Sequence, residues 1–116
     1  MEYHEPYDKL SEEAKDLHRA ISSLIEELEA VNWYHQRADV TTDEQLKRIL
    51  IHNRDEEVEH AAMALEWLRR RLPVLDTELR EILFQDGEIV HHHGEDQAGE
   101  GPGSGGLGLG SLKEEN

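Results

Sequence analysis

The chain has 116 residues, enough for one domain with a modest core. It contains no cysteine, which excludes disulfides and thiolate metal or redox sites. Its net charge of −15, from 27 acidic residues against 12 Lys and Arg, disfavours nucleic acid and anionic membranes as partners, because phosphate binding needs clustered cations. The charge suits cations, although in most acidic proteins it serves solubility alone.

Targeting and membrane signals are missing from the sequence. No apolar run approaches the ~20 residues that cross a bilayer. The first ten residues, MEYHEPYDKL, lack the basic and apolar regions of a secretory signal. We therefore expect a cytoplasmic protein with no membrane partner.

The glycines divide the chain into two parts. All 9 of them lie at or after Gly87. We predict a helical domain over 1–86, followed by a flexible linker rich in Gly and acids over 87–104 and a terminal peptide over 105–116.

The first 86 residues have helical periodicity throughout. Ser11 is expected to cap a first helix that runs to about Ala38 and has apolar residues at Leu17, Ile21, Leu24, Ile25, Leu28 and Val31. A second helix is expected after a cap at Thr41, Thr42 or Asp43, and it ends with three arginines before Pro73. A short third helix is predicted over about Val74 to Gln85.

Two helices of this length joined by a short turn form an antiparallel hairpin. One hairpin with a short third helix cannot bury both apolar faces, and a lone pair of helices is marginally stable. The predicted fold is therefore all-α, an antiparallel two-helix hairpin plus a short C-terminal helix. We expect it to dimerise into a four-helix bundle.

Carboxylates fall on both apolar helix faces. Glu27 shares a face with Leu24 and Val31, and Glu57 shares one with Ala61 and Leu68. His60, three residues after Glu57, lies on the same side. An unpaired buried carboxylate costs several kcal/mol, roughly. A buried cation is the simplest explanation for both.

The spacing indicates which kind of cation site this is. Di-iron and di-manganese bundles take one Glu from each of two helices and Glu-x-x-His from each of the other two. This chain has one inward Glu, Glu27, and one inward Glu-x-x-His, Glu57 with His60. That is half a site, which a two-fold dimer would complete. The ligand types suit iron, manganese or zinc.

Other interpretations stay open at this point. Glu-x-x-His recurs at Glu88 and His91, so the string alone is weak evidence. His60 could be a hydrogen-bonded core residue, and Glu57 could pair with Arg54 on the helix surface. Other roles remain unassigned for Tyr34 (packing or a hydrogen bond to a ligand), Trp33 (packing), Glu26 and Glu29 (solvated) and His91, His92 and His93 (loose metal binding or none).

Two long blocks carry a family resemblance. HRAISSLIEELEAVNWYHQR and ILIHNRDEEVEHAAMALEWLRRR resemble the encapsulated ferritins, the ferritin-like cargo of encapsulin nanocompartments, and the similarity spans about His4 to Phe84. In the tail, GGLGLGSLK resembles the peptide that docks such cargo to the encapsulin shell. Leu109 stands where isoleucine or valine is more usual.

The resemblance implies a ferroxidase, an enzyme that oxidises Fe(II) to Fe(III) with dioxygen at a di-iron centre shared across a two-fold interface. By position, Glu27 would bridge the two irons, and Glu57 and His60 of each chain would complete their coordination. Tyr34 would hydrogen-bond near the site and Trp33 would lie beside it. Glu26 and Glu29 resemble the acidic residues that attract incoming metal.

The resemblance also implies partners. The homodimers would assemble into an annular decamer, and the encapsulin shell would be bound through three apolar anchors, Leu107, Leu109 and Leu112. Mineral would be stored in the lumen of the nanocompartment. The alternative from another class is a non-catalytic helical metal-binding or scaffold cargo protein.

Overall fold

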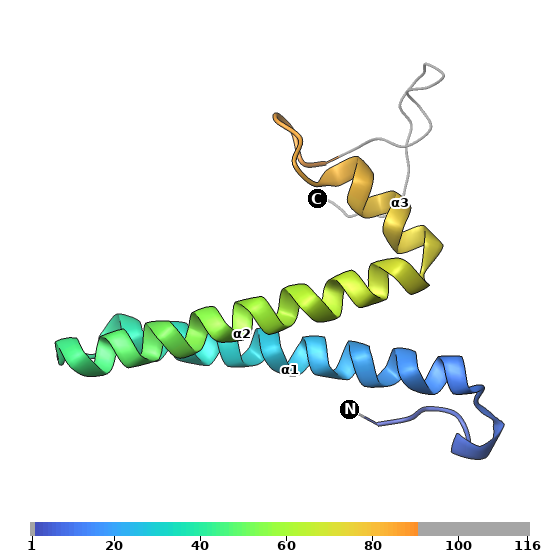
Figure 1. The fold of residues 1–116 in the computed structure, drawn as a ribbon, viewed down its shortest axis with the longest axis horizontal. Coiled ribbons are helices and arrows are strands. Elements are labelled where there is room, and N and C mark those ends of the chain that lie inside the picture. Colours follow the sequence, from blue (N-terminus) through green and yellow to red (C-terminus); the bar gives the residue numbers. More distant parts are fainter. Residues whose placement is uncertain (1, 91–116) are drawn as a thin grey trace. The chain divides into compact units, whose positions relative to one another are not determined.

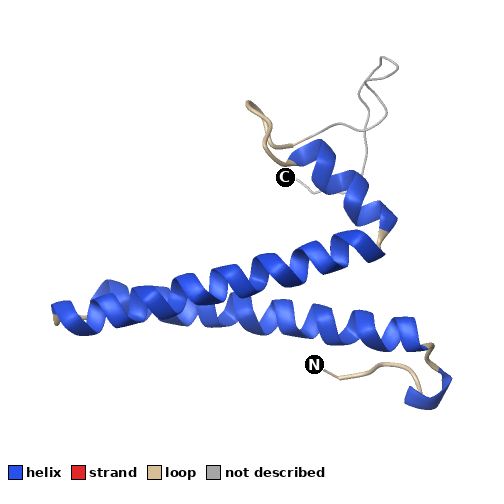
Figure 2. Ribbon diagram, in the orientation of Figure 1, coloured by secondary structure: helices blue, strands red, loops and turns tan. Residues whose placement is uncertain are grey.

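The computed structural model describes residues 2–90. A short 3₁₀ helix, η1 (Tyr7–Lys9), precedes three α-helices, α1 (Glu12–Val40), α2 (Glu44–Arg71) and α3 (Pro73–Ile82) (Figure 1). Figure 2 shows that the regular structure of the described residues is helical throughout. The predicted all-α class, with two long helices and one short one, is confirmed.

Helices α1 and α2 form the predicted hairpin and lie side by side (Figure 1). The expected cap on α1 is present, since the Ser11 hydroxyl accepts a hydrogen bond from the Ala14 amide at 3.0 Å. Of the three candidate caps on α2, Asp43 is the one used, and its carboxylate accepts from the Leu46 amide at 2.8 Å. The first helix continues to Val40, slightly beyond the predicted end.

The hairpin buries little apolar surface by itself. The buried apolar residues among those described are Ala38, Ala61 and Leu68. Large apolar side chains stay exposed along both helices, at Ile21, Ile25, Leu28, Leu46, Ile49, Val58 and Met63. The stability of so small a core rests on few contacts, which is the reason we predict self-association.

An aromatic cluster fastens the N-terminal segment to the start of α1. The Tyr3 ring stacks on His18 with centroids 4.0 Å apart. The Lys15 ammonium lies 4.1 Å from the centroid of the Tyr7 ring and 3.3 Å from the Glu12 carboxylate. Lys15 is buried, and these contacts compensate its charge, because the ammonium interacts with both the Tyr7 ring and the Glu12 carboxylate.

An ion-pair network ends α2. Arg69 donates two hydrogen bonds to Glu66, both at 2.8 Å, and also binds Asp76 in α3. Arg70 donates a further bond to Glu66 at 2.7 Å. Hydrogen bonds from Arg69 and then Arg70 lower the pKa of Glu66 to about 2. The three arginines thus do more than complement the helix dipole, because they pair with specific acids.

Helix α3 begins at Pro73 and ends at Ile82, short of the predicted Gln85. The early end coincides with Phe84, whose φ of 59° lies in the left-handed region, where the Cβ atom of a non-glycine residue crowds the backbone. A residue in this conformation cannot continue a right-handed helix, so the pattern Leu79, Ile82, Leu83 overstated its length.

The chain divides into two units, Met1–Thr77 and Glu78–Asn116. The first contains the hairpin, and the second is described only over residues 78–90. Most of the predicted linker and the whole terminal peptide lie outside the described residues, so the domain boundary at residue 86 stays a prediction. Among the described residues, no helix is both long and apolar enough to span a membrane.

Candidate metal centre

Glu27 lies in the middle of α1 and is half-buried. Its Oε1 atom is buried and has no hydrogen-bond partner. Buried polar atoms in folded proteins nearly always have a partner, because leaving one unsatisfied costs roughly 1–3 kcal/mol. An oxygen in this state is a candidate ligand for a cation supplied from outside the chain.

Glu57 and His60 lie one turn apart on α2. The His60 Nδ1 is 3.5 Å from the Glu57 Oε1, so both side chains point to the same region, as the i, i+3 spacing predicts. The His60 side chain is 43% exposed and the Glu57 side chain is 28% exposed. Both were predicted to lie on an apolar face, and of their neighbours on that face Ala61 is buried. In a single chain the pair is therefore accessible.

The register of the hairpin relates Glu27 to this pair. Near the open end of the hairpin, the Arg71 guanidinium lies 4.0 Å from the Glu13 carboxylate. In an antiparallel pair, each step forward along α1 is matched by one step back along α2. Fourteen steps from Glu13 lead to Glu27, and fourteen back from Arg71 lead to Glu57.

A second contact, nearer the turn, gives a similar answer. Arg54 of α2 lies 3.2 Å from the ring nitrogen Nδ1 of His35 in α1. Eight steps back from His35 lead to Glu27, and eight forward from Arg54 lead to Ala62. Glu27 thus lies level with residues 57–62, the turn and a half of α2 that includes the Glu-x-x-His pair.

One chain does not assemble these side chains into a complete metal centre. Within residues 2–90, no group of three or more His, Asp or Glu side chains is placed to hold a metal ion. The donor types present at this level of the hairpin, carboxylate oxygen and imidazole nitrogen, are those that iron, manganese and zinc accept.

The remaining predicted residues surround this level of α1. Tyr34 is half-buried, and its ring lies 5.3 Å from the Arg37 guanidinium carbon, a contact that the sequence did not indicate. Trp33 is 48% exposed and borders a shallow hollow with Gln36 and Arg37. The predicted metal-attracting acids, Glu26 and Glu29, are both exposed.

Arg54 has other partners than the one considered from the sequence. It binds its neighbour Asp55 through two nitrogens, at 3.0 and 2.9 Å, and reaches across the hairpin to His35. Glu57 instead lies beside His60. The alternative in which Arg54 neutralises Glu57 is therefore wrong. A contact between residues 19 apart becomes visible only when the helix register is known.

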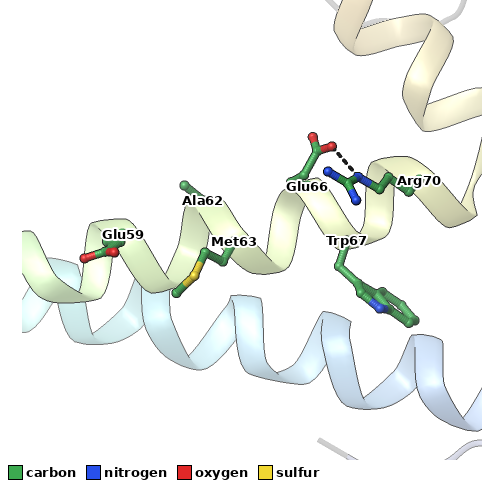
Figure 3. Close-up of a pocket in the computed structure, with 6 residues that line it drawn as sticks. All are labelled: Glu59, Ala62, Met63, Glu66, Trp67 and Arg70. Carbon is green, nitrogen blue, oxygen red and sulfur yellow. Dashed lines mark hydrogen bonds and ion pairs between the residues drawn. The ribbon is translucent and has the colours of Figure 1, made fainter.

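A second hollow runs along one face of α2 (Figure 3). It is bordered by Glu59, Ala62, Met63, Glu66, Trp67 and Arg70. Figure 3 shows the ion pair between Glu66 and Arg70, whose atoms lie 2.7 Å apart. Because arginines engage Glu66, this face does not offer it to a metal ion, in contrast to Glu27.

A helical hairpin with a partnerless carboxylate oxygen level with a Glu-x-x-His turn is the arrangement expected of half a ferritin-like four-helix bundle. The comparisons with known proteins then give the family. The profile of the EncFtn-like family matches residues 2–86. An encapsulated ferritin-like protein of Rhodospirillum rubrum is 52% identical, covering 97% of this chain and 88% of its own. The chain belongs to the EncFtn-like family, and the resemblance noted in the sequence is confirmed.

Further relatives agree. A ferritin-like protein of Thermotoga maritima is 50% identical, covering 96% of this chain and 97% of its own. The encapsulin nanocompartment cargo protein EncC of Myxococcus xanthus is 46% identical over 50% of this chain and 45% of its own. The crystal structure of protein ne0167 from Nitrosomonas europaea superposes with a TM-score of 0.75 at 56% identity, covering 78% of this chain and all of that one.

Proposed function

We propose that this protein is a ferroxidase whose substrates are Fe(II) and dioxygen. Membership of the family supports a ferritin-like protein with an iron-related role. The observation that supports the ferroxidase is the buried Oε1 of Glu27, which has no hydrogen-bond partner among residues 2–90. A carboxylate held in this state is suited to binding a cation, and iron is the ion that the family name indicates.

Two chains would share the site. One chain contributes Glu27 on α1 and the pair of Glu57 and His60 on α2, and a two-fold axis would double this set. The two Glu27 carboxylates would bridge two Fe(II) ions, and Glu57 and His60 of each chain would complete the coordination. Each of the two Fe(II) ions gives up one electron, and the two electrons, together with two protons from water, reduce one dioxygen to hydrogen peroxide.

Burial of apolar surface would add to metal binding in favouring the dimer. Large apolar side chains near the site, Ile21, Ile25, Leu28 and Val58, are exposed in the single chain. Covering ~100 Å² of apolar surface stabilises an interface by about 2.5 kcal/mol. The annular decamer stays part of the proposal on the strength of the family resemblance.

The side chains around the ligands would serve the same reaction. Glu26 and Glu29 are exposed and add negative charge beside Glu27, so they would attract Fe(II) to the site. The hydroxyl of Tyr34 would donate a hydrogen bond to a ligand carboxylate. Trp33 would lie beside the centre, where its exposed ring is available for packing against a second chain.

The test is oxidation of Fe(II) followed by stopped-flow absorbance. Wild type should oxidise Fe(II) well above the rate of buffer, and Glu57→Ala should fall close to that background. Glu59→Ala removes the same charge two residues away on α2, at the hollow of Figure 3, and should retain wild-type activity. Wild type and Glu57→Ala both at the background rate would refute the ferroxidase.

The alternative is a non-catalytic metal-binding or scaffold cargo protein. Wild type that binds iron stoichiometrically without accelerating its oxidation would establish that alternative. Anomalous scattering at the iron edge, from crystals soaked in Fe(II), would locate the ion. Density away from Glu27, Glu57 and His60 would reject the assigned ligands.

We propose further that the protein is carried inside an encapsulin shell, because one relative is an encapsulated ferritin-like protein and another is an encapsulin nanocompartment cargo protein. The anchors would be Leu107, Leu109 and Leu112, which lie outside the described residues. Deleting residues 105–116 should abolish loading into a co-expressed shell and leave Fe(II) oxidation intact. Loading that survives the deletion would reject the terminal peptide as the docking segment.

A further inference from the structure

The contact between Arg54 and His35 is the shorter of two polar side-chain contacts that join α1 to α2 in the described part of the chain. Arg54 lies 3.2 Å from His35, and Arg71 lies 4.0 Å from Glu13 near the other end of the hairpin. Among the described residues, the other salt bridges of α1 and α2 stay within one helix or, for Arg69, lead to Asp76 of α3. The two contacts lie on either side of the Glu27 level.

The chemistry of the Arg54 contact fixes its direction. A guanidinium has five N–H donors and no acceptor, so Nδ1 of His35 must be the acceptor and carries no proton. Asp55 accepts from Nε and a terminal nitrogen of Arg54 and thereby orients the guanidinium plane. The other terminal nitrogen then points at His35. The Arg54 side chain is 27% exposed and His35 is exposed, so the contact lies at the surface of the hairpin.

This contact is close to the metal-binding turn. Arg54 precedes Glu57 by one helical turn, and His35 directly follows Tyr34. A slip of one residue between two helices moves them by about 1.5 Å and turns the side chains by about 100°. Either change would move Glu57 and His60 relative to Glu27. The hairpin buries only three apolar residues among those described, Ala38, Ala61 and Leu68, so few packed side chains define the register of α1 against α2.

We propose that Arg54 is a positioning residue, which donates to His35 to hold Glu57 and His60 level with Glu27. This inference rests on the proposed metal site and deepens it. Arg54 does not bind iron itself. It acts on metal affinity through the register of the two helices.

The first measurement needs no metal. Urea unfolding of the metal-free, full-length protein gives a double-mutant cycle from Arg54→Met, His35→Leu and the double variant. A direct contact predicts non-additivity of roughly threefold or more in the unfolding equilibrium constant. Arg48→Met serves as the matched control, since Arg48 is an exposed arginine of α2 with no polar partner among the described residues, and its change should add independently to His35→Leu. Additive effects of Arg54→Met and His35→Leu would overturn the proposal.

The second measurement is metal affinity. Anaerobic titration with Fe(II) should show roughly tenfold weaker binding for Arg54→Met, the loss typical of groups that orient ligands. In the oxidation assay the KM for Fe(II) should rise to match, with kcat within about twofold of wild type. Arg54→Lys keeps one donor and should recover part of the affinity, whereas Arg48→Met should match wild type.

The outcomes separate this inference from the proposed function. Wild type that binds Fe(II) but does not oxidise it would reject the ferroxidase, and the affinities of Arg54→Met and wild type would still decide the role of Arg54. Equal affinities in a helical, folded Arg54→Met would overturn the positioning role and leave the ferroxidase standing. A wild type that binds no Fe(II) would overturn both.

Discussion

Two acid clusters on α2 differ in how they are satisfied. At the end of the helix, Glu66 accepts hydrogen bonds from Arg69 and Arg70, and its pKa falls to about 2. In the middle, Glu57 lies 3.5 Å from the His60 imidazole and has no Arg or Lys partner among the described residues, where the Oε1 of Glu27, level with it on α1, also lacks a partner. The chain has arginines available, since Arg54 lies one turn from Glu57, yet that arginine binds Asp55 and His35.

The partners of Glu66 and of Glu27 differ in the way expected of a carboxylate that stabilises the fold and a carboxylate that would bind metal. A carboxylate that stabilises the fold is paired, because hydrogen bonds from two arginines satisfy its oxygen atoms and neutralise its charge. An acid kept for a metal must remain unpaired in the metal-free chain and is destabilising there. Under the proposed metal site, Glu27 would be a carboxylate left unpaired for the ion, whereas the arginine partners of Glu66 are those of a carboxylate that stabilises the fold.

The largest expected effect concerns association. Dilute metal-free protein should be largely monomeric, and anaerobic Fe(II) should drive it into dimers or larger assemblies. Glu27→Gln should block this response because it removes the charge that would bridge the two metal ions. Glu66→Gln makes the same change in the paired cluster and should associate like wild type. Size-exclusion chromatography with light scattering measures both; association indifferent to metal would argue against a shared site.

A smaller effect is expected on stability. Glu27→Leu should raise the free energy of unfolding of the metal-free protein by about 1 kcal/mol, because it removes a carboxylate oxygen that is buried without a partner. The same variant should lose Fe(II) oxidation. Chemical unfolding followed by circular dichroism gives the stability. A destabilised Glu27→Leu would mean that the carboxylate has a stabilising role within the single chain.

Helical periodicity and capping residues were sufficient to predict the hairpin. The Ser11 cap and the two long helices follow from local sequence, and local rules fail only where tertiary or left-handed geometry intervenes, as at Phe84. The pairing of Glu57 with His60 was likewise predictable, since both lie on one helix. Cross-helix contacts such as Arg54 to His35 were not, because they depend on a register that periodicity leaves undefined.

The smallest effect tests the paired cluster. The pKa of Glu66 is lowered from 4.5 to about 2 on folding, so the folded state favours the ionised form. The resulting stabilisation is fully present above pH ~4.5 and is lost as the pH falls toward 2.

Glu66→Gln should therefore lower the Tm at pH 7 by a small amount, because the group is exposed and screened. The difference from wild type should shrink between pH 5 and 2. Glu59→Gln, on the same face of α2 in Figure 3, is the control, and its difference from wild type should lack this decline. A Glu66→Gln difference that stays constant down to pH 2 would show that the arginines contribute packing to this end of α2 and no charge pairing.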